Sequence, residues 1–162
     1  MRIEEFERLY AEHAEPLLAF LVYRTGNRPL AEDILADTFE RVLRARRRFD
    51  PRKASEKTWI YSIALNLVRD SARRHAAETR ALERAVTVPA PGLEPDALGA
   101  VEDRDTLARA LEALTADERE AIALRYGADL TVPEIAKLLG ERLTTIEGRV
   151  YRALRKLRDA LG

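Results

Sequence analysis

The side chains with the greatest potential for ligand binding are arginines and lysines, and they are concentrated in two stretches of the chain. Residues 41–84 carry 13 basic and 5 acidic side chains, and residues 121–162 carry 8 basic and 5 acidic ones. Residues 1–40 and 85–120 are acidic, so the net charge of the whole chain is +0. Clustered cations attract polyanions. The alternation therefore favours two surfaces that face a polyanion, although uneven charge is also common on helical proteins that bind none.

The sequence offers no candidate for a catalytic or metal centre. It has no cysteine, no HExxH motif, no phosphate-binding glycine loop and no nucleophile elbow. Its two histidines are far apart: His13 lies on the apolar stripe of a predicted helix, and His75 lies within a basic run. We therefore expect that the chain is not an enzyme and needs neither a cofactor nor a metal ion.

The elements that position the basic side chains are predicted to be α-helices. Ala, Leu, Arg and Glu dominate the composition, while there are only 7 Gly and 7 Pro. No apolar run approaches the roughly 18 residues that a membrane span needs. The first residues, MRIEEFERLY, are charged and amphipathic, which is not typical of a secretory signal. We expect an all-α protein of the cytoplasm.

Three helices are predicted in the first half of the chain, at 3–25, 29–48 and about 56–85. Gly26 and Asn27 end the first of them. Ser55 is the expected N-cap of the third, whose apolar face includes Trp59. Tryptophan at apolar helical spacing usually belongs to the core, so we expect packing there rather than base stacking.

A proline-rich segment separates this half from the rest of the chain. VTVPAPGLEPDALG holds three prolines and two glycines and shows no helical stripe. We therefore predict two domains, at 1–85 and 101–162, joined by a flexible linker at 86–100.

The second domain is predicted to end in a helix-turn-helix. Thr115 begins a capping box, T-A-D-E, that starts a helix ending near Gly127. A short helix at 132–139, a turn at Gly140 and a longer basic helix at about 144–160 follow. A helix of this kind fits the DNA major groove, and its arginines would meet phosphates. The alternative is an ordinary helical hairpin with a charged, solvated outer face.

Two blocks of the sequence resemble conserved regions of bacterial sigma factors. The second region resembles AEDILADTFERVLRARRRFDPR (31–52) followed by TWIYSIALNLVRDSARR (58–74). The fourth region resembles LEALTADEREAIALRYGADLTVPEIAKLLG (111–140) and the basic helix after it. The length and linker suit the extracytoplasmic-function group (ECF, group IV) of the sigma-70 family, which keeps only these two domains. The resemblance implies a three-to-four-helix bundle followed by a four-helix domain with the helix-turn-helix.

The resemblance also implies a transcription initiation factor that binds core RNA polymerase and directs it to specific promoters. The residues that would bind polymerase are Glu32, Asp33, Asp37, Glu40 and Arg41. Those that would recognise and melt the minus-10 element are Asn66, Arg69, Arg73 and Arg74. Those that would bind the minus-35 element are Arg142, Thr144, Thr145, Arg149, Arg152, Arg155 and Lys156. An anti-sigma factor is a further expected partner, because members of this group are usually inhibited by one.

Several positions depart from the pattern of this group. Ala36 stands where Gln is usual, Leu65 where Arg is frequent, and Glu147 where a basic residue is common. The usual apolar residue and Ser or Thr cap of the turn are replaced by Glu141 and Arg142. A substitute capping box from Thr144 to Glu147 would make Glu147 structural. If Glu147 instead faces DNA, it would repel phosphate or accept a hydrogen bond from a cytosine.

Two other functions remain open at this point. A DNA-binding regulator that recruits no polymerase would share the helix-turn-helix but not the first domain. A sigma-like protein that has lost promoter-directing activity would titrate a partner, and Ala36 and Glu147 keep that reading open. The two domains also either pack in a closed form, which the opposite charges of 41–84 and 85–120 favour, or tumble separately.

Overall fold

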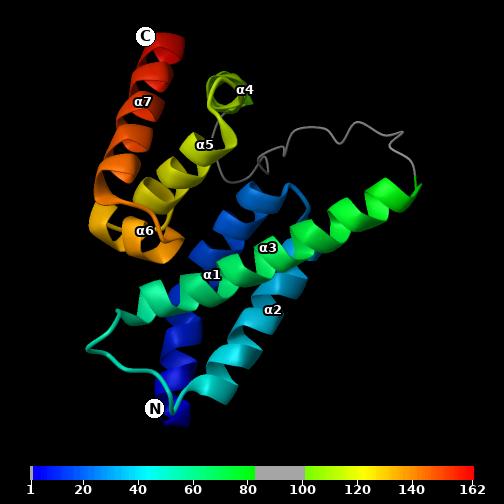
Figure 1. Cartoon of the computed structure of the whole chain (residues 1–162), viewed down its shortest axis with the longest axis vertical. Coiled ribbons are helices and arrows are strands. Elements are labelled where there is room, and N and C mark those ends of the chain that lie inside the picture. The colour runs from blue at the N-terminus through cyan, green and yellow to red at the C-terminus, as the bar shows by residue number, and fades with distance from the viewer. Residues whose placement is uncertain (1, 83–100) are drawn as a thin grey trace.

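The computed structural model describes residues 2–82 and 101–162, and every regular element in these residues is helical (Figure 1). The predicted all-α class is therefore confirmed. The predicted linker at 86–100 lies outside the described residues. None of the described helices is both long enough and apolar enough to cross a membrane. The elements are α1 (Ile3–Thr25), α2 (Arg28–Ala45), α3 (Glu56–Leu82), α4 (Val101–Glu112), α5 (Ala116–Ile122), η2 (Ala123–Gly127), α6 (Val132–Leu139) and α7 (Leu143–Leu161).

The first three helices form one bundle, in which α1 packs on α2 and both contact α3 (Figure 1). Gly26 ends α1 in the left-handed region at φ 66°, which a residue without a Cβ adopts at no steric cost. Its N–H donates to the Val22 carbonyl at 2.8 Å. Asn27 then caps α2 by accepting a hydrogen bond from the Leu30 N–H at 3.1 Å. Gly26 and Asn27 therefore determine where the chain reverses direction between α1 and α2.

Helix α2 ends at Ala45, three residues before the predicted end. Arg48 N–H donates to the Ala45 carbonyl at 2.8 Å, which closes a turn in place of another helical turn. The Arg46 guanidinium donates to the Leu43 carbonyl at 2.7 Å and so satisfies one of the free carbonyls at the helix end. The basic run thus caps α2 instead of extending it.

The predicted N-cap of α3 is confirmed. Ser55 Oγ accepts a hydrogen bond from the Thr58 N–H at 3.1 Å. Trp59 is half-buried and its ring lies 4.8 Å from that of Phe49, centroid to centroid. This packing agrees with the expectation that Trp59 belongs to the core.

The second half of the chain packs around α7, which contacts α4, α5 and α6. Thr115 and Glu118 form the predicted capping box, with hydrogen bonds of 3.1 and 2.8 Å between each side chain and the other residue's N–H. Thr131 and Glu134 form a second capping box at the start of α6. Gly140 ends α6 at φ 67°, as expected of the tight turn in a helix-turn-helix.

Helix α7 begins at Leu143, so the substitute capping box from Thr144 to Glu147 is wrong. Arg142 is the N-cap residue, and no side chain caps this end of the helix. The Ile146 N–H already donates to the Arg142 carbonyl at 3.2 Å, which places Thr144 inside the first turn. A side chain inside the first turn cannot serve as the N-cap, and Glu147 is left without a capping partner.

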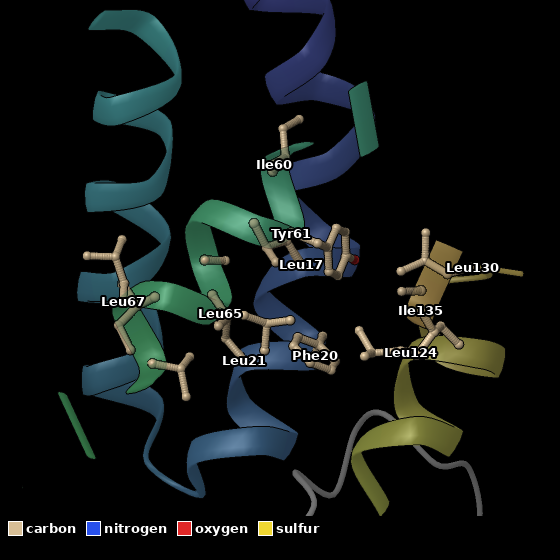
Figure 2. Close-up of a cluster of buried hydrophobic side chains, with 14 of the residues drawn as sticks. Leu17, Phe20, Leu21, Ile60, Tyr61, Leu65, Leu67, Leu124, Leu130 and Ile135 are labelled. Carbon is tan, nitrogen blue, oxygen red and sulfur yellow. The ribbon is translucent and has the colours of Figure 1, made fainter. Parts of the chain in front are cut away.

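The two halves of the chain pack against each other through an apolar seam (Figure 2). Phe20 of α1 and Tyr61 of α3 face Leu124, Leu130 and Ile135 of the second half. All five side chains are at most 5% exposed. Their burial, rather than opposite charge alone, accounts for the closed arrangement.

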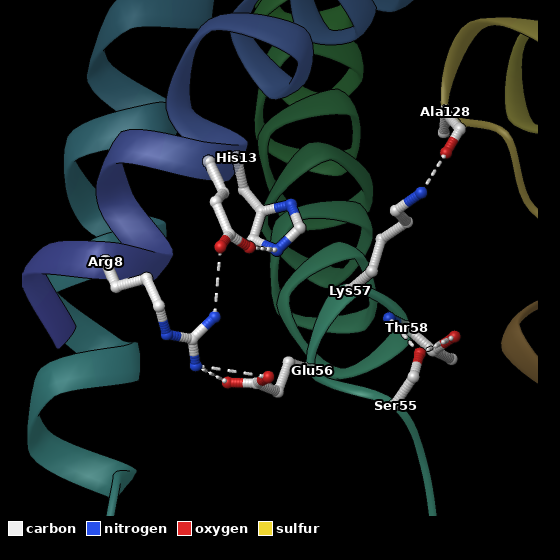
Figure 3. A network of polar contacts seen from close by, with 8 residues as sticks. Arg8, His13, Ser55, Glu56, Lys57, Thr58 and Ala128 are labelled. Atoms are coloured by element: carbon white, nitrogen blue, oxygen red, sulfur yellow. Dashed lines mark hydrogen bonds and ion pairs between the residues drawn. The ribbon is translucent and has the colours of Figure 1, made fainter. Parts of the chain in front are cut away.

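Polar contacts flank the seam. Lys57 Nζ donates to the Ala128 carbonyl at 3.0 Å (Figure 3). Thr58 Oγ1 donates to Glu134 Oε2 at 3.3 Å, and Arg24 Nε lies 3.2 Å from Glu120 Oε2. Only the last of these joins opposite charges, and Arg24 lies outside the basic stretch 41–84. Among the described residues no ion pair joins 41–84 to 85–120, so the charge-based reason for the closed form is not supported.

Truncation of the seam is expected to lower stability. Leu124 is completely buried, and Leu124→Ala would remove the branched end of the side chain and leave a cavity. We expect a loss of about 2–5 kcal/mol in the free energy of unfolding, measured by urea denaturation. Tyr126 lies two residues on and is 56% exposed, so Tyr126→Ala is the matched control and should change stability by less than about 0.5 kcal/mol. Equal losses in the two variants would contradict the packing described.

Candidate nucleic-acid interface

The outer face of α3 presents the residues predicted for the minus-10 element. Leu65, Leu67 and Val68 are buried, and this fixes which side of the helix meets solvent. The predicted residues are exposed on the other side: Asn66, Arg69, Arg73 and Arg74. A helical face of this composition has guanidinium groups for a phosphate backbone and an amide for a base edge.

The arginines of this face differ in their partners. Arg73 is ion-paired with Asp70, one turn earlier on the same helix. Within the part of the chain that the structure describes, Arg69 and Arg74 make no ion pair. These two guanidinium groups are therefore available to a polyanion without breaking an internal contact.

The face of α2 presents the residues predicted to bind polymerase, and all of them are exposed: Glu32, Asp33, Asp37, Glu40 and Arg41. Glu32 pairs with Arg28 at 3.0 Å and Glu40 with Arg44 at 2.6 Å. Exposed pairs of this kind are weak and exchange readily for a partner's charges. Asp33 and Asp37 have no ion pair among the described residues.

A shallow groove between α2 and α3 brings the two predicted sets together. Asp33, Ala36 and Asp37 line it from α2, and Ser71 and Arg74 line it from α3. Its continuation is lined by Asp37, Arg41, Leu67, Asp70, Arg73 and Arg74. The small side chain of Ala36 therefore leaves room beside the unpaired carboxylates. A partner bound along α2 would lie next to a strand bound along α3.

The outer face of α7 carries a stripe of residues that none of the other described helices buries. Ile146, Val150 and Ala153 of α7 are buried, so the opposite face of the helix is exposed to solvent. Thr144, Gly148, Tyr151 and Arg155 follow one another on that face at helical spacing. Tyr151 is 67% exposed, the largest value among the exposed large hydrophobic side chains. Tyr151 is not among the residues predicted from the sequence, although its spacing from Thr144 places it on the same face.

Several of the residues predicted for the minus-35 element are engaged inside the second half of the chain. Arg149 is only 17% exposed and lies 3.3 Å from Glu141 and 3.7 Å from Asp117. Arg152 and Lys156 both reach Glu118, at 3.8 and 2.8 Å. The exposed members of the predicted set that make no ion pair in the described residues are Arg142, Thr144 and Arg155, and Thr145 is half-buried.

Glu118 links α5 to α7 and is the one acidic side chain of the described residues that is buried. Burial works to raise its pKa, but hydrogen bonds from Lys156 and from the Thr115 N–H outweigh burial, and the pKa lies below its usual value of 4.5. The ionised carboxylate therefore holds the first turn of α5 and the basic helix together at neutral pH.

Acid is expected to weaken this link. Because the pKa of Glu118 is lower in the folded state, its contribution to stability is present above about pH 4.5 and is lost as pH falls through the folded-state pKa. Thermal unfolding from about pH 7 to pH 3 should show a smaller acid-induced loss for Glu118→Gln than for the unaltered chain. Glu112→Gln, at an exposed position, is the control. Parallel losses in all three proteins would contradict this role.

Comparison with known proteins gives two family-model matches, to Sigma-70 region 2 over residues 9–78 and to Sigma-70, region 4 over residues 104–157. RNA polymerase sigma factor CarQ of Myxococcus xanthus is 35% identical over 161 residues, which cover 98% of this chain and 90% of CarQ. The chain belongs to the extracytoplasmic-function group of the sigma-70 family. ECF RNA polymerase sigma factor SigX of Bacillus subtilis is 30% identical to this sigma factor, over 96% of this chain and 82% of SigX.

Solved structures of sigma factors also resemble this one. The sigma factor RpoE of Bartonella quintana, solved in complex with the anti-sigma factor NepR, matches with a TM-score of 0.83 and 25% identity. That match covers 98% of this chain and 97% of RpoE. CnrH, solved with the cytosolic domain of CnrY, matches with a TM-score of 0.68 and 25% identity, over 99% of this chain and 89% of CnrH. The predicted family and two-domain all-α architecture are confirmed.

The departures of this sigma factor from the pattern of its group fall into two kinds. Leu65 is 2% exposed within the core, so the apolar residue there has a packing role. Ala36 lies in the groove between α2 and α3, and Glu147 is exposed on α7. These two positions bear on surfaces that a partner can reach, as do the exposed Glu141 and Arg142 of the turn.

Proposed function

We propose that this sigma factor binds core RNA polymerase and directs it to specific promoters by recognising and melting the minus-10 element and binding the minus-35 element. One observation carries the proposal: the same chain holds a mixed-charge groove beside an exposed cationic helix face and a separate helix-turn-helix. A DNA-binding regulator that recruits no polymerase has no use for the first of these features.

The polymerase contact is assigned to α2. Asp33 and Asp37 present two unpaired carboxylates one helical turn apart, and Ala36 lies between them at the edge of the groove. Complementary charge steers association and fixes register. The polymerase surface that meets α2 is therefore expected to carry cationic side chains on a helical element.

The minus-10 contact is assigned to α3 and the minus-35 contact to α7. A melted strand needs cations along its backbone, and Arg69, Arg73 and Arg74 supply them on one face. Helix α7 enters the major groove with its N-terminal half, and Arg155 reaches the flanking phosphates. We place the domains at 1–85 and 101–162, with the linker at 86–100, because the two family models match within those bounds.

An anti-sigma factor is the further partner we propose. One solved relative, RpoE, is in complex with the anti-sigma factor NepR. Another, CnrH, is in complex with the cytosolic domain of CnrY. We also infer that the protein acts in the cytoplasm, where polymerase and promoters are found, and that it assists the catalysis of polymerase without a catalytic centre of its own.

The test is open-complex formation on a library of promoter fragments. The purified chain is mixed with bacterial core polymerase, and melted DNA is detected by permanganate footprinting of the retained fragments. We expect a selected set of fragments that share two elements and melt at one of them. Binding to polymerase with no selective melting would show instead a sigma-like protein that titrates its partner, and no binding to polymerase would contradict the proposal.

A further inference from the structure

Glu147 is an exposed acidic side chain in the half of α7 that enters the DNA groove. It lies three residues after Thr144 and four before Tyr151, so it neighbours both on the helix surface. It caps no backbone group, because α7 begins at Leu143. Within the described part of the chain it makes no hydrogen bond or ion pair. An acidic residue in this position has no structural task that the fold reveals.

Carboxylates of the second half of the chain engage two of the nearby arginines. Arg149 is held by Glu141 and Asp117 on the side toward α5. The Arg152 guanidinium lies across Gly148, since a Cβ at Gly148 would stand 2.9 Å from Arg152 Nη1. The same side chain approaches Glu118. Gly148 therefore lets Arg152 fold back along its own helix toward Glu118, while the Arg152 side chain stays 59% exposed.

In the N-terminal half of α7, the exposed side chains that no carboxylate engages are consequently neutral or acidic. Thr144 and Tyr151 flank Glu147, and neither is charged. A carboxylate only accepts hydrogen bonds, and the major groove offers it the exocyclic amino groups of cytosine and adenine. Glutamate pairs with the cytosine N4 amino group, whereas guanine and thymine present acceptors in its place. Methyl and ring surfaces on either side suit the C5-methyl group of thymine.

We propose that Glu147 reads a cytosine in the minus-35 element by accepting a hydrogen bond from its N4 amino group, with Tyr151 against a neighbouring thymine methyl. The inference rests on the proposed function and adds the base that this sigma factor selects. The exposed N-cap residue Arg142 and the exposed Arg155 of α7 stand before and after Glu147 in the chain and offset its repulsion of phosphate.

The test is base selection by holoenzymes assembled from the full chain and bacterial core polymerase, on promoter fragments randomised through the minus-35 element. The unaltered chain should enrich cytosine at one position by about tenfold over other bases. Glu147→Ala should lose that preference, and Glu147→Gln should move it to adenine, whose N6 and N7 suit an amide. Asp159→Asn, which removes an exposed carboxylate at the far end of the same helix, should leave it unchanged.

The outcomes separate this inference from the function on which it rests. The same base preference in the unaltered chain, Glu147→Ala and Glu147→Gln would overturn the role of Glu147 and leave the promoter-directing function standing. Failure of the unaltered holoenzyme to select any promoter would overturn both. A weaker preference for thymine next to the cytosine in Tyr151→Ala would support the proposed neighbour contact, and an unchanged one would remove Tyr151 from it.

Discussion

Replacing Arg73 and Arg74 together with alanine is expected to lower open-complex formation by roughly 100-fold or more, because two hydrogen-bonded charges contribute about 1.5–3 kcal/mol each. Both side chains are exposed, and the one ion pair they make with another described residue is the surface pair between Arg73 and Asp70. Folding should therefore change little. Permanganate reactivity of the melted strand measures the effect, and circular dichroism checks that the helices remain.

A charge-conserving variant distinguishes charge from geometry at the same positions. Arg73→Lys/Arg74→Lys keeps both cations but loses the planar guanidinium, so it should retain much more activity than the alanine variant. The slope of log affinity against log salt should fall by about 2 in the alanine variant and stay nearly constant in the lysine variant. Open complexes at the unaltered level with both arginines removed would exclude α3 from strand binding.

Reversing the charge of Asp33 and Asp37 is expected to abolish holoenzyme assembly. Both carboxylates are unpaired among the described residues and line the groove between α2 and α3. In Asp33→Arg/Asp37→Arg, like charges would face the cationic surface inferred for polymerase, and such juxtaposition costs several kcal/mol. We expect affinity for core polymerase to fall by about 100-fold or more, measured by fluorescence anisotropy of the labelled chain.

The matched control changes net charge by the same amount elsewhere. Glu7→Arg/Glu15→Arg alters two exposed glutamates of α1 that make no ion pair in the described residues. Its affinity for core polymerase should stay within a few-fold of the unaltered chain. Equal losses in the two double variants would mean that net charge, and not the α2 surface, governs assembly.

Local signals in the sequence predicted most of the fold. Apolar spacing located the helices, and Ser55, Thr115 and Gly140 marked their ends because each provides a backbone contact within a few residues. The predicted boundaries were wrong at the end of α2 and at the start of α7, where the local sequence offers more than one possible capping residue. Arg46 caps α2 early through its own guanidinium, and Arg142 begins α7 although its side chain caps nothing.

The candidate site was predicted less completely, because partners distant in sequence decide which charges are free. Arg149 is of the residue type expected for a phosphate contact, yet an ion pair with Asp117 of α5 helps to hold its side chain inward. The seam between the two halves depends on apolar residues such as Tyr61 and Leu124. Helical periodicity predicts that such residues are buried, but it does not predict which residues they pack against. Tyr151 was not predicted, although its spacing from Thr144 places it on the outer face of α7, where it is 67% exposed.

Binding to both promoter elements requires the two halves of the chain to separate. The minus-10 and minus-35 elements lie about 25 base pairs apart, or roughly 85 Å along B-DNA at 3.4 Å per base pair. In the closed arrangement, α3 contacts α6 directly. The seam around Leu124 must therefore open when the holoenzyme engages a promoter.

Directed DNA cleavage tests the central claim, that one half of the chain holds the minus-10 element while the other holds the minus-35 element. The chain has no cysteine, so a single one can be introduced to carry an iron chelate that cleaves nearby DNA. Ala72 on α3 and Leu143 at the start of α7 are both exposed and suit this use. In holoenzyme bound to a selected promoter, the reagent on Ala72→Cys should cut around the minus-10 element, and the reagent on Leu143→Cys around the minus-35 element. Cleavage by both at one element, or by neither, would contradict the account.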